Sequence, residues 1–210
     1  MIRSALLSVL VLATASFCHA QEEGKDEKPQ ASTEPKGLPL ELRIVGELAG
    51  WELDSRGDPA TKFQEKIRAG EKSGQLVSAT RVELELEIRN TGSSSIRIWV
   101  SGDATLLTFD LKGPGAMTAD SKEPLNGTIA PQTVTIAPGK SHRIPFTSLA
   151  HGKRLKARHS YITEIGRYQL SATFKTGVSP APSGSKGSSA GFGEVILKSA
   201  PIEFNVKRPS

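Results

Sequence analysis

The chain has 210 residues, of which 37% are hydrophobic and 23% charged, and its formal net charge is +5. This composition suits one ordinary hydrophobic core and excludes a disulfide-rich scaffold, because the chain has a single cysteine, Cys18. No segment after the first 20 residues approaches the roughly 18 to 20 apolar residues that a membrane-spanning helix needs.

The first 20 residues have the pattern of a secretory signal peptide. Arg3 precedes an apolar run over residues 5–11, and small residues follow as far as Ala20. We therefore expect an exported protein, periplasmic or extracellular, from which Cys18 is removed with the signal. Lipidation of Cys18 is the alternative, but Phe17 stands where such sites carry a small residue.

Residues 21–37, QEEGKDEKPQASTEPKG, contain no large apolar side chain and predict a disordered tether. Residues 38–207 are then expected to form one domain. Its first strand is predicted in LPLELRIVG, because Leu40, Leu42 and Ile44 alternate with charged residues.

A short helix is predicted from Asp58 to Gly70. Asp58 would cap its start, Pro59 would take the first helical position, and Gly70 would end it. Phe63 and Ile67 are four residues apart, so they would pack the same face of this helix against the core.

The clearest strand pattern is RVELELEIRNTG. The apolar residues from Val82 to Ile88 alternate with Glu83, Glu85 and Glu87, which predicts one buried and one solvated face. The turn NTGSSS follows, and IRIWV is expected to pair back as a hairpin. Further strands are predicted at Thr105–Leu111, Thr133–Ile136, Ser141–Pro145, Tyr168–Lys175 and Glu194–Val206, with Pro201 making an edge or a bend.

Short strands at this spacing, with one minor helix, predict an all-β fold: an Ig-like antiparallel β-sandwich of about seven to nine strands. Gly177–Gly191 is eleven-fifteenths Gly, Ser or Pro and is expected to be a mobile loop between the last two strands.

ELEIRNTG, TIAPGKS and TEIGRYQLSATF contain turns of the N-x-G, P-G-[KE]-[ST] and P-G-x-Y types, with Ile165 at the Pro position of the last. These three motifs resemble the turns of the bacterial Ig-like sandwiches of the intracellular proteinase inhibitor (BsuPI-type) superfamily, and the chain is also similar to uncharacterised exported bacterial proteins of this kind. The resemblance spans about residues 38–206 and implies a fold, but it carries over no inhibitory residue. The matched turn residues are Asn90, Gly92, Pro138, Gly139, Gly166 and Tyr168.

Tyr168 follows the turn at Glu164–Gly166 and enters the next strand. In Ig-like sandwiches a tyrosine in this place bonds its hydroxyl to backbone upstream, in a tyrosine corner. The alternative is a strand-entry tyrosine without a special bond.

Sequence patterns for catalysis and cofactors are weak. GSSAG at residues 187–191 matches a nucleophile elbow but lacks its strand and helix, and the alternating Glu83, Glu85 and Glu87 are more typical of a solvated strand face. The histidines at 142, 151 and 159 lack zinc-site spacing. Asn126 begins an N-x-T sequon and also suits a turn. We expect no catalytic activity, no metal and no cofactor.

The residues from His151 to Ser160, HGKRLKARHS, form the most basic segment of the chain. Lys153, Arg154, Lys156 and Arg158 lie within six residues, whereas the region from residue 21 to 58 has ten acids and five bases. This predicts an anion-binding loop for an acidic polysaccharide or envelope protein; the alternative is a solvated loop. Nucleic acid is disfavoured because no aromatic residue interleaves these cations.

Trp51 and Trp99 suit either a carbohydrate-binding platform or, more commonly, the core. Taken together, the patterns indicate a non-catalytic exported binding or assembly module at the cell envelope. The alternative is a protease inhibitor that acts through an exposed loop.

Overall fold

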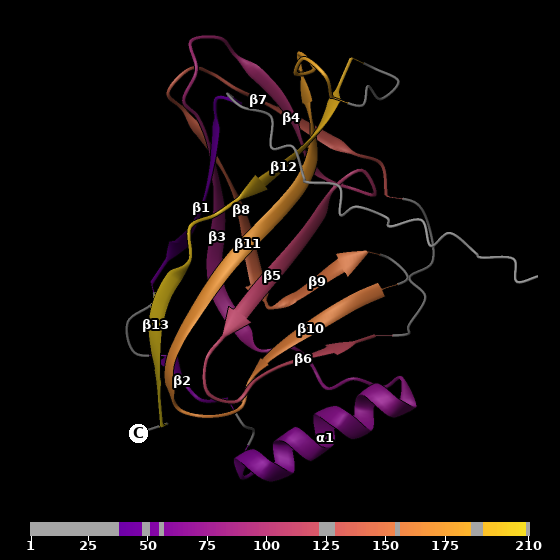
Figure 1. Cartoon of the computed structure of the whole chain (residues 1–210), viewed down its shortest axis with the longest axis vertical. Helices are drawn as coiled ribbons and strands as arrows, with labels where there is room; N and C mark the ends of the chain where they lie inside the picture. Colours follow the sequence, from indigo (N-terminus) through magenta and orange to yellow (C-terminus); the bar gives the residue numbers. More distant parts are fainter. Residues whose placement is uncertain are drawn as a thin grey trace, which may run out of the picture. The chain divides into compact units, whose positions relative to one another are not determined.

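A computed structural model describes residues 38–47, 51–54, 57–121, 129–153, 156–185 and 191–208. Expectations for residues 1–37, Asn126, Arg154 and residues 187–190 lie outside these residues. The described parts contain thirteen strands and one helix (Figure 1). They are β1 (Leu40–Gly46), β2 (Trp51–Glu52), α1 (Ala60–Ser73), β3 (Arg81–Asn90), β4 (Ile96–Ser101), β5 (Leu106–Lys112), β6 (Ala116–Asp120), β7 (Gln132–Ile136), β8 (Ser141–Ser148), β9 (Ala150–Lys153), β10 (Lys156–Ile162), β11 (Gly166–Ser179), β12 (Gly193–Lys198) and β13 (Ile202–Lys207).

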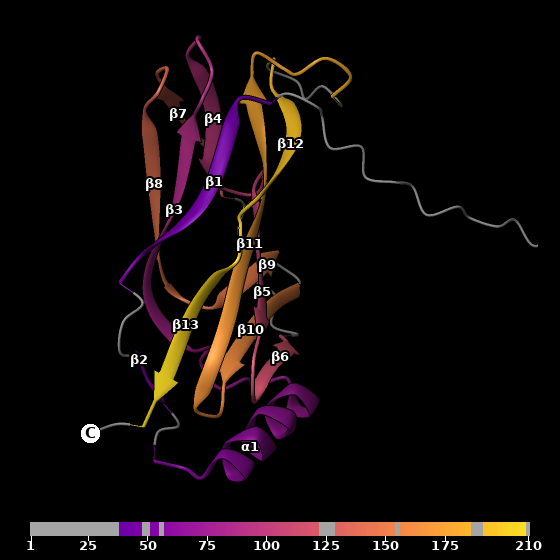
Figure 2. The same ribbon diagram turned by 60° about the vertical axis from the view of Figure 1, so that its left-hand side comes forward.

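Two sheets face each other and enclose the main core (Figure 2). The smaller has the order β1-β3-β8; the larger has the order β2-β13-β11-β4-β7, and β5 and β12 also pair with the long strand β11. All these pairs are antiparallel except the two-residue pairing of β2 with β13. The chain is therefore an all-β, Ig-like sandwich, as the sequence predicted.

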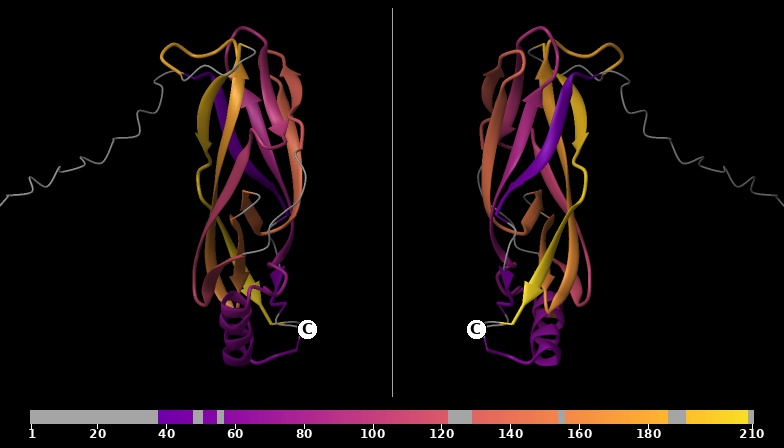
Figure 3. Two further views of the ribbon diagram at one scale, coloured as in Figure 1. Left: turned by 90° about the vertical axis from the view of Figure 1, so that its right-hand side faces the viewer. Right: turned by 90° about the vertical axis from the view of Figure 1, so that its left-hand side faces the viewer.

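A third sheet, β6-β10-β9, raises the number of strands above the seven to nine expected. The helix α1 packs beside it, and Phe63 and Ile67 form a second buried cluster with Ala119 and Tyr161. Figure 3 shows α1 at the end of the sandwich where β13 ends, and we call this the helix end. β9 and β10 carry Gly, His and cations, and β6 has only five residues, so their sequences lack the apolar alternation that revealed β3.

Strand β3 has the two faces that its alternation predicted. Val82, Leu84, Leu86 and Ile88 are buried between the sheets. Burying each such side chain contributes roughly 1.5 to 3 kcal/mol relative to leaving it exposed. The opposite face is polar, and Arg143 of β8 pairs there with Glu85 at 3.3 Å and with Glu87 at 3.5 Å.

The predicted hairpin between β3 and β4 is wrong. Both edges of β3 are occupied, by β1 and by β8, so β4 joins β7 and β11 in the other sheet. Residues 91–95 thus cross between the sheets, and buried Asn90 stabilises the crossing. Its Nδ2 donates to the carbonyls of Ser94 (2.8 Å) and Ile136 (2.9 Å), and its Oδ1 accepts from the Gly92 N–H (2.9 Å).

The turn between β7 and β8 packs against the same asparagine. Lys140 N–H donates to the Ala137 carbonyl at 3.1 Å, which closes the turn, and Gly139 has a φ of 69°. The Gly139 N–H also donates to the Asn90 carbonyl, and the Asn90 N–H to the Lys140 carbonyl, both at 2.9 Å. Two of the predicted turns therefore bind each other, and we call their location the turn end.

The Tyr168 hydroxyl donates to the Glu164 carbonyl at 2.8 Å and also contacts the carbonyl of Pro114. This upstream backbone bond is the one that defines a tyrosine corner. Burial raises the pKa of Tyr168 to about 12. Gly113 lies under the ring, where an added Cβ would stand 2.3 Å from a ring carbon, so the ring and this backbone are closely packed.

The helix begins and ends later than predicted. Pro59 takes the capping position without a side-chain bond, and Asp58 instead pairs with Lys62 at 3.3 Å and with Lys66. The helix runs past Gly70 because Gly74, with a φ of 82°, supplies the left-handed residue that ends it.

The last strands differ from the prediction at two positions. Gly177 to Ser179 belong to β11 and not to a loop. The Trp99 ring packs directly against Gly177, where an added Cβ would stand 2.3 Å from a ring carbon, and the Thr176 hydroxyl donates to the Trp99 carbonyl at 2.7 Å. These contacts hold this part of the chain in the sheet. The strand predicted at Glu194–Val206 is divided into β12 and β13, and Pro201 lies in the bend between them.

Candidate functional site

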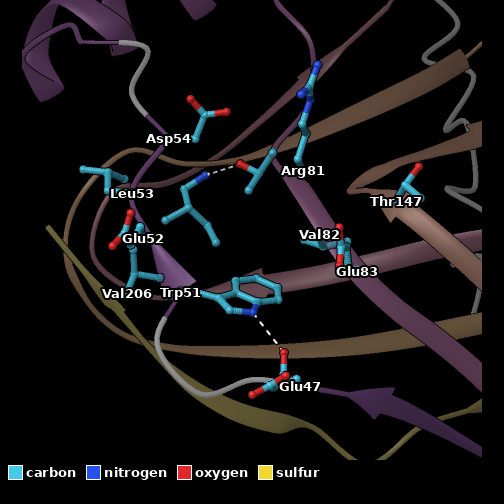
Figure 4. Close-up of a pocket in the computed structure, with 12 residues that line it drawn as sticks. Glu47, Trp51, Glu52, Leu53, Asp54, Arg81, Val82, Glu83, Thr147 and Val206 are labelled. Atoms are coloured by element: carbon cyan, nitrogen blue, oxygen red, sulfur yellow. Dashed lines mark hydrogen bonds between the residues drawn. The ribbon is translucent and has the colours of Figure 1, made fainter. Parts of the chain in front are cut away.

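A cavity of about 760 Å³ opens at the helix end, between β2 and β13 of the larger sheet and the start of β3 in the smaller (Figure 4). This volume lies within the range of typical ligand sites. We call it the Trp51 groove. It is lined by Glu47, Trp51, Glu52, Leu53, Asp54, Thr80, Arg81, Val82, Glu83, Thr147, Ile162 and Val206.

The groove forms because β1 does not extend alongside the first three residues of β3. β1 pairs with β3 from Leu84 to Asn90 only, and its last residue, Gly46, lies opposite Leu84. Gly46 has a φ of 142°, and an added Cβ there would stand 2.8 Å from the Leu84 side chain. Among the described residues, no strand pairs with Arg81–Glu83 on the side that β1 has left.

Trp51 combines a packing role with an exposed surface. Its ring centroid lies 4.5 Å from that of Phe204, and its Nε1 donates to the Glu47 carbonyl at 3.1 Å. The side chain is only half-buried, and Figure 4 shows the indole among the lining residues of the groove. Trp51 is thus anchored by the core and available to a ligand. Trp99 instead stacks on Phe192 at 4.6 Å and lines no part of this cavity.

The rim of the Trp51 groove is acidic. Glu47, Asp54 and Glu83 form no ion pair with any described residue, and Glu52 adds a fourth carboxylate to the lining. Among the described lining residues, only Arg81 carries a positive charge. Close carboxylates without partners produce a negative potential that favours a cationic ligand.

The described residues of the basic segment, which was predicted to be an anion-binding loop, belong to the paired strands β9 and β10. Lys153 ends β9 and Lys156 begins β10, while Arg154 and the side chains of both lysines lie outside the description. Arg158 is exposed and pairs with Asp120 of β6, with Nε 2.7 Å from Oδ1. Its charge is therefore partly neutralised, and the structure does not bring the four cations together as a described site.

The three histidines lie apart from the groove. His151 is buried with its ring edge-on to Phe109, and burial lowers its pKa. His159 Nδ1 lies 3.1 Å from the Val77 carbonyl, and His142 lies in β8 opposite Ile88. Within the described ranges there is no group of three or more side chains placed to hold a metal ion. No described helix has the length and apolarity to cross a bilayer.

A second cavity, of about 570 Å³, lies at the turn end between residues 92–96 and residues 178–183. Its lining is mostly Ser, Pro and Gly, and none of the lining residues carries a charged side chain. It lacks the aromatic ring and the carboxylates of the Trp51 groove, so it offers few groups that would select a ligand.

Comparison with known proteins assigns no function. No family model and no curated protein matches the chain. Among solved structures, the ASH / PapD-like domain of human CEP192 (PapD-like domain 7) is 11% identical, covers 98% of this chain and 100% of that chain, and has a TM-score of 0.27. AvmM, described as catalysing macrocyclization in alchivemycin A biosynthesis, is 15% identical over 84% and 96%, with a TM-score of 0.32. At these TM-scores neither likeness carries an argument, and the fold described above rests on the sheet topology.

Sequence reasoning missed the Trp51 groove as a site. One signal pointed toward it: the surplus of acids between residues 21 and 58 includes Glu47, Glu52 and Asp54. Glu83 joins them only through the pairing of β3 with β1, which brings residues some 30 positions apart to one end of the sandwich.

Proposed function

We propose that the protein is a non-catalytic binding module exported to the cell envelope, and that the Trp51 groove is its binding site. The signal-peptide pattern of residues 1–20 supports export, and the sandwich supplies a rigid scaffold on which strand ends hold the site. The resemblance of the turns to BsuPI-type domains supports the same class of module, although it names no ligand.

One observation carries this proposal: a half-exposed tryptophan lies in a cavity beside three carboxylates that have no described ionic partner. Like charges close together destabilise a folded protein, and an exposed aromatic ring gains nothing from water. Groups that conflict with stability in this way occur mainly at functional sites. The groove therefore has the character of a surface kept for a ligand.

The direct test is recovery of a partner from an envelope extract by three forms of the immobilised protein. Wild type should retain a specific partner, and Trp51→Ala should retain at least ten-fold less of this partner. The matched control is Ile196→Ala, which removes an apolar side chain that is 45% exposed on β12, outside the groove. This control should bind as wild type does.

Two results would overturn the proposal. Equal recovery of every partner by wild type and Trp51→Ala would mean that the Trp51 groove is not the binding site. Stoichiometric inhibition of a protease panel, unchanged by Trp51→Ala, would support the inhibitor alternative with an exposed loop as its site.

A further inference from the structure

The first feature that suggests an occupant for the Trp51 groove is an open strand edge. Arg81–Glu83 of β3 faces the cavity on the side where no described strand pairs with it. Backbone N–H and C=O groups on such an edge form a template for an added strand. Three residues at about 3.3 Å each would pair with roughly three residues of a peptide.

The second feature is the distribution of apolar and charged groups along that edge. Val82 is buried and points toward the core, whereas Arg81 and Glu83 are exposed on the other face. A strand paired with β3 would follow the same alternation, because facing residues of paired strands point to the same side. Its inward side chain would meet apolar lining residues such as Trp51 and Val206, and its outward side chains would meet Glu83 and the acidic rim.

The third feature is charge complementarity. The described part of the lining has four carboxylates and one guanidinium, and within the same part of the chain Glu47, Asp54 and Glu83 have no ionic partner. A lysine or arginine side chain would supply that partner. Glu83 would attract a cation placed opposite it, whereas Arg81 on the same face would repel one and weaken binding.

We propose that the Trp51 groove binds an extended peptide segment that alternates apolar and cationic residues and pairs as a short strand with Arg81–Glu83. The proposal rests on the proposed function of the groove and specifies its ligand class. The backbone of the segment supplies affinity, its apolar residue contacts Trp51, and its Lys or Arg residues neutralise the rim.

The test uses three synthetic peptides and ¹⁵N–¹H NMR titration of the full mature chain. Acetyl-KVKVK-amide should shift the amide signals of Val82 and Glu83 in a saturable manner. The same peptide with N-methyl groups on its central backbone amides keeps its charge but cannot pair as a strand, so its affinity should fall at least ten-fold. Acetyl-EVEVE-amide should not bind.

Two protein variants complete the test. The triple variant Glu47→Gln, Asp54→Asn and Glu83→Gln should bind acetyl-KVKVK-amide at least ten-fold more weakly. Its control is Glu65→Gln, which removes an exposed carboxylate of α1 outside the groove and should change nothing. Arg81→Ala should strengthen binding by a few-fold, because it removes the one cation among the described lining residues.

Equal binding of the N-methylated and unmodified peptides would overturn strand pairing, and equal binding to the triple variant would overturn the role of the rim. If no peptide binds while the pull-down still shows a partner that depends on Trp51, the ligand class is wrong and the proposed function stands. If the pull-down also shows no such partner, the proposed function fails with it.

Discussion

The two ends of strand β3 differ in how their polar groups are used. At the turn end, the side chain of Asn90 makes three hydrogen bonds inside the protein and is fully buried. At the helix end, about 23 Å away by strand geometry, Glu83 and its neighbours Glu47 and Asp54 have no ionic partner among the described residues. Polar groups at the first end stabilise the fold, whereas those at the second leave interactions available.

The last residue of β3 is thus fixed by internal hydrogen bonds, whereas its first residues leave an edge without a described partner strand. At the turn end, local sequence signals and tertiary bonds agree, because the turn between β7 and β8 and the crossing after β3 bind each other. At the helix end, β1 stops short and leaves an edge and a cavity. Loss of the Asn90 side chain and neutralisation of the carboxylates of the Trp51 groove should therefore change stability in opposite directions.

The largest effect is expected for Asn90→Ala at the turn end. The change removes three hydrogen bonds, to two carbonyls and one N–H, and leaves a gap where the buried side chain was, so the free energy of unfolding should fall by about 3 kcal/mol. Urea denaturation measures it. Ser93→Ala, an exposed position in the same crossing, is the control and should stay within about 0.5 kcal/mol of wild type. Equal stability of Asn90→Ala and wild type would mean that the crossing is not held by this side chain.

Tyr168→Phe should have a smaller effect. It removes the hydroxyl bond to the Glu164 carbonyl but keeps the ring, so unfolding should become easier by about 1 kcal/mol.

The pKa of Tyr168 adds a dependence on pH. Because burial raises this pKa to about 12, above the value of about 10 for an unfolded tyrosine, its stabilising contribution is complete below pH 10 and is lost as pH rises through 12. Stability measured from pH 9 to 12 should fall more steeply for wild type than for Tyr168→Phe. Parallel curves would contradict the raised pKa.

The basic segment should affect stability still less. Arg158→Ala removes an exposed ion pair with Asp120 and should cost about 0.5 kcal/mol.

The triple variant Lys153→Glu, Arg154→Glu and Lys156→Glu keeps that pair and tests anion binding separately. If the segment binds an acidic polysaccharide, wild type should be retained on an anionic heparin column and eluted by salt, and the variant should not be retained. Retention of both forms to the same salt concentration would make the segment a solvated surface.

The sequence predicted those parts of the fold in which local chemistry decides the structure. The alternation in β3 marks its buried face, and the prolyl-glycyl turn at Pro138–Gly139 needs a glycine with positive φ. The pairing of strands depends on which edges are already occupied. The hairpin prediction failed because β8, which follows β3 by some 50 residues, occupies the edge that β4 would have used.

The candidate site was less predictable than the fold. The cations of residues 153–158 are close together in the sequence and therefore conspicuous, yet Arg158 forms an ion pair with Asp120. The Trp51 groove draws on residues from 47 to 206, and its cavity arises from the place where β1 ends. The sequence does not distinguish Trp51 from Trp99. Only the sheet arrangement shows that the Trp51 ring lines a cavity, whereas the Trp99 ring covers Gly177.

The smallest change in stability gives the most direct test of the claim that the groove serves a ligand rather than the fold. The measurement is the free energy of unfolding of Glu47→Gln, Asp54→Asn and Glu83→Gln combined, against wild type in low salt. The variant should be equal to wild type or more stable by about 0.5 kcal/mol, and the difference should vanish near 1 M salt, because repulsion among exposed carboxylates is screened. A loss of 1 kcal/mol or more would contradict it, since the carboxylates would then stabilise the sandwich as Asn90 does.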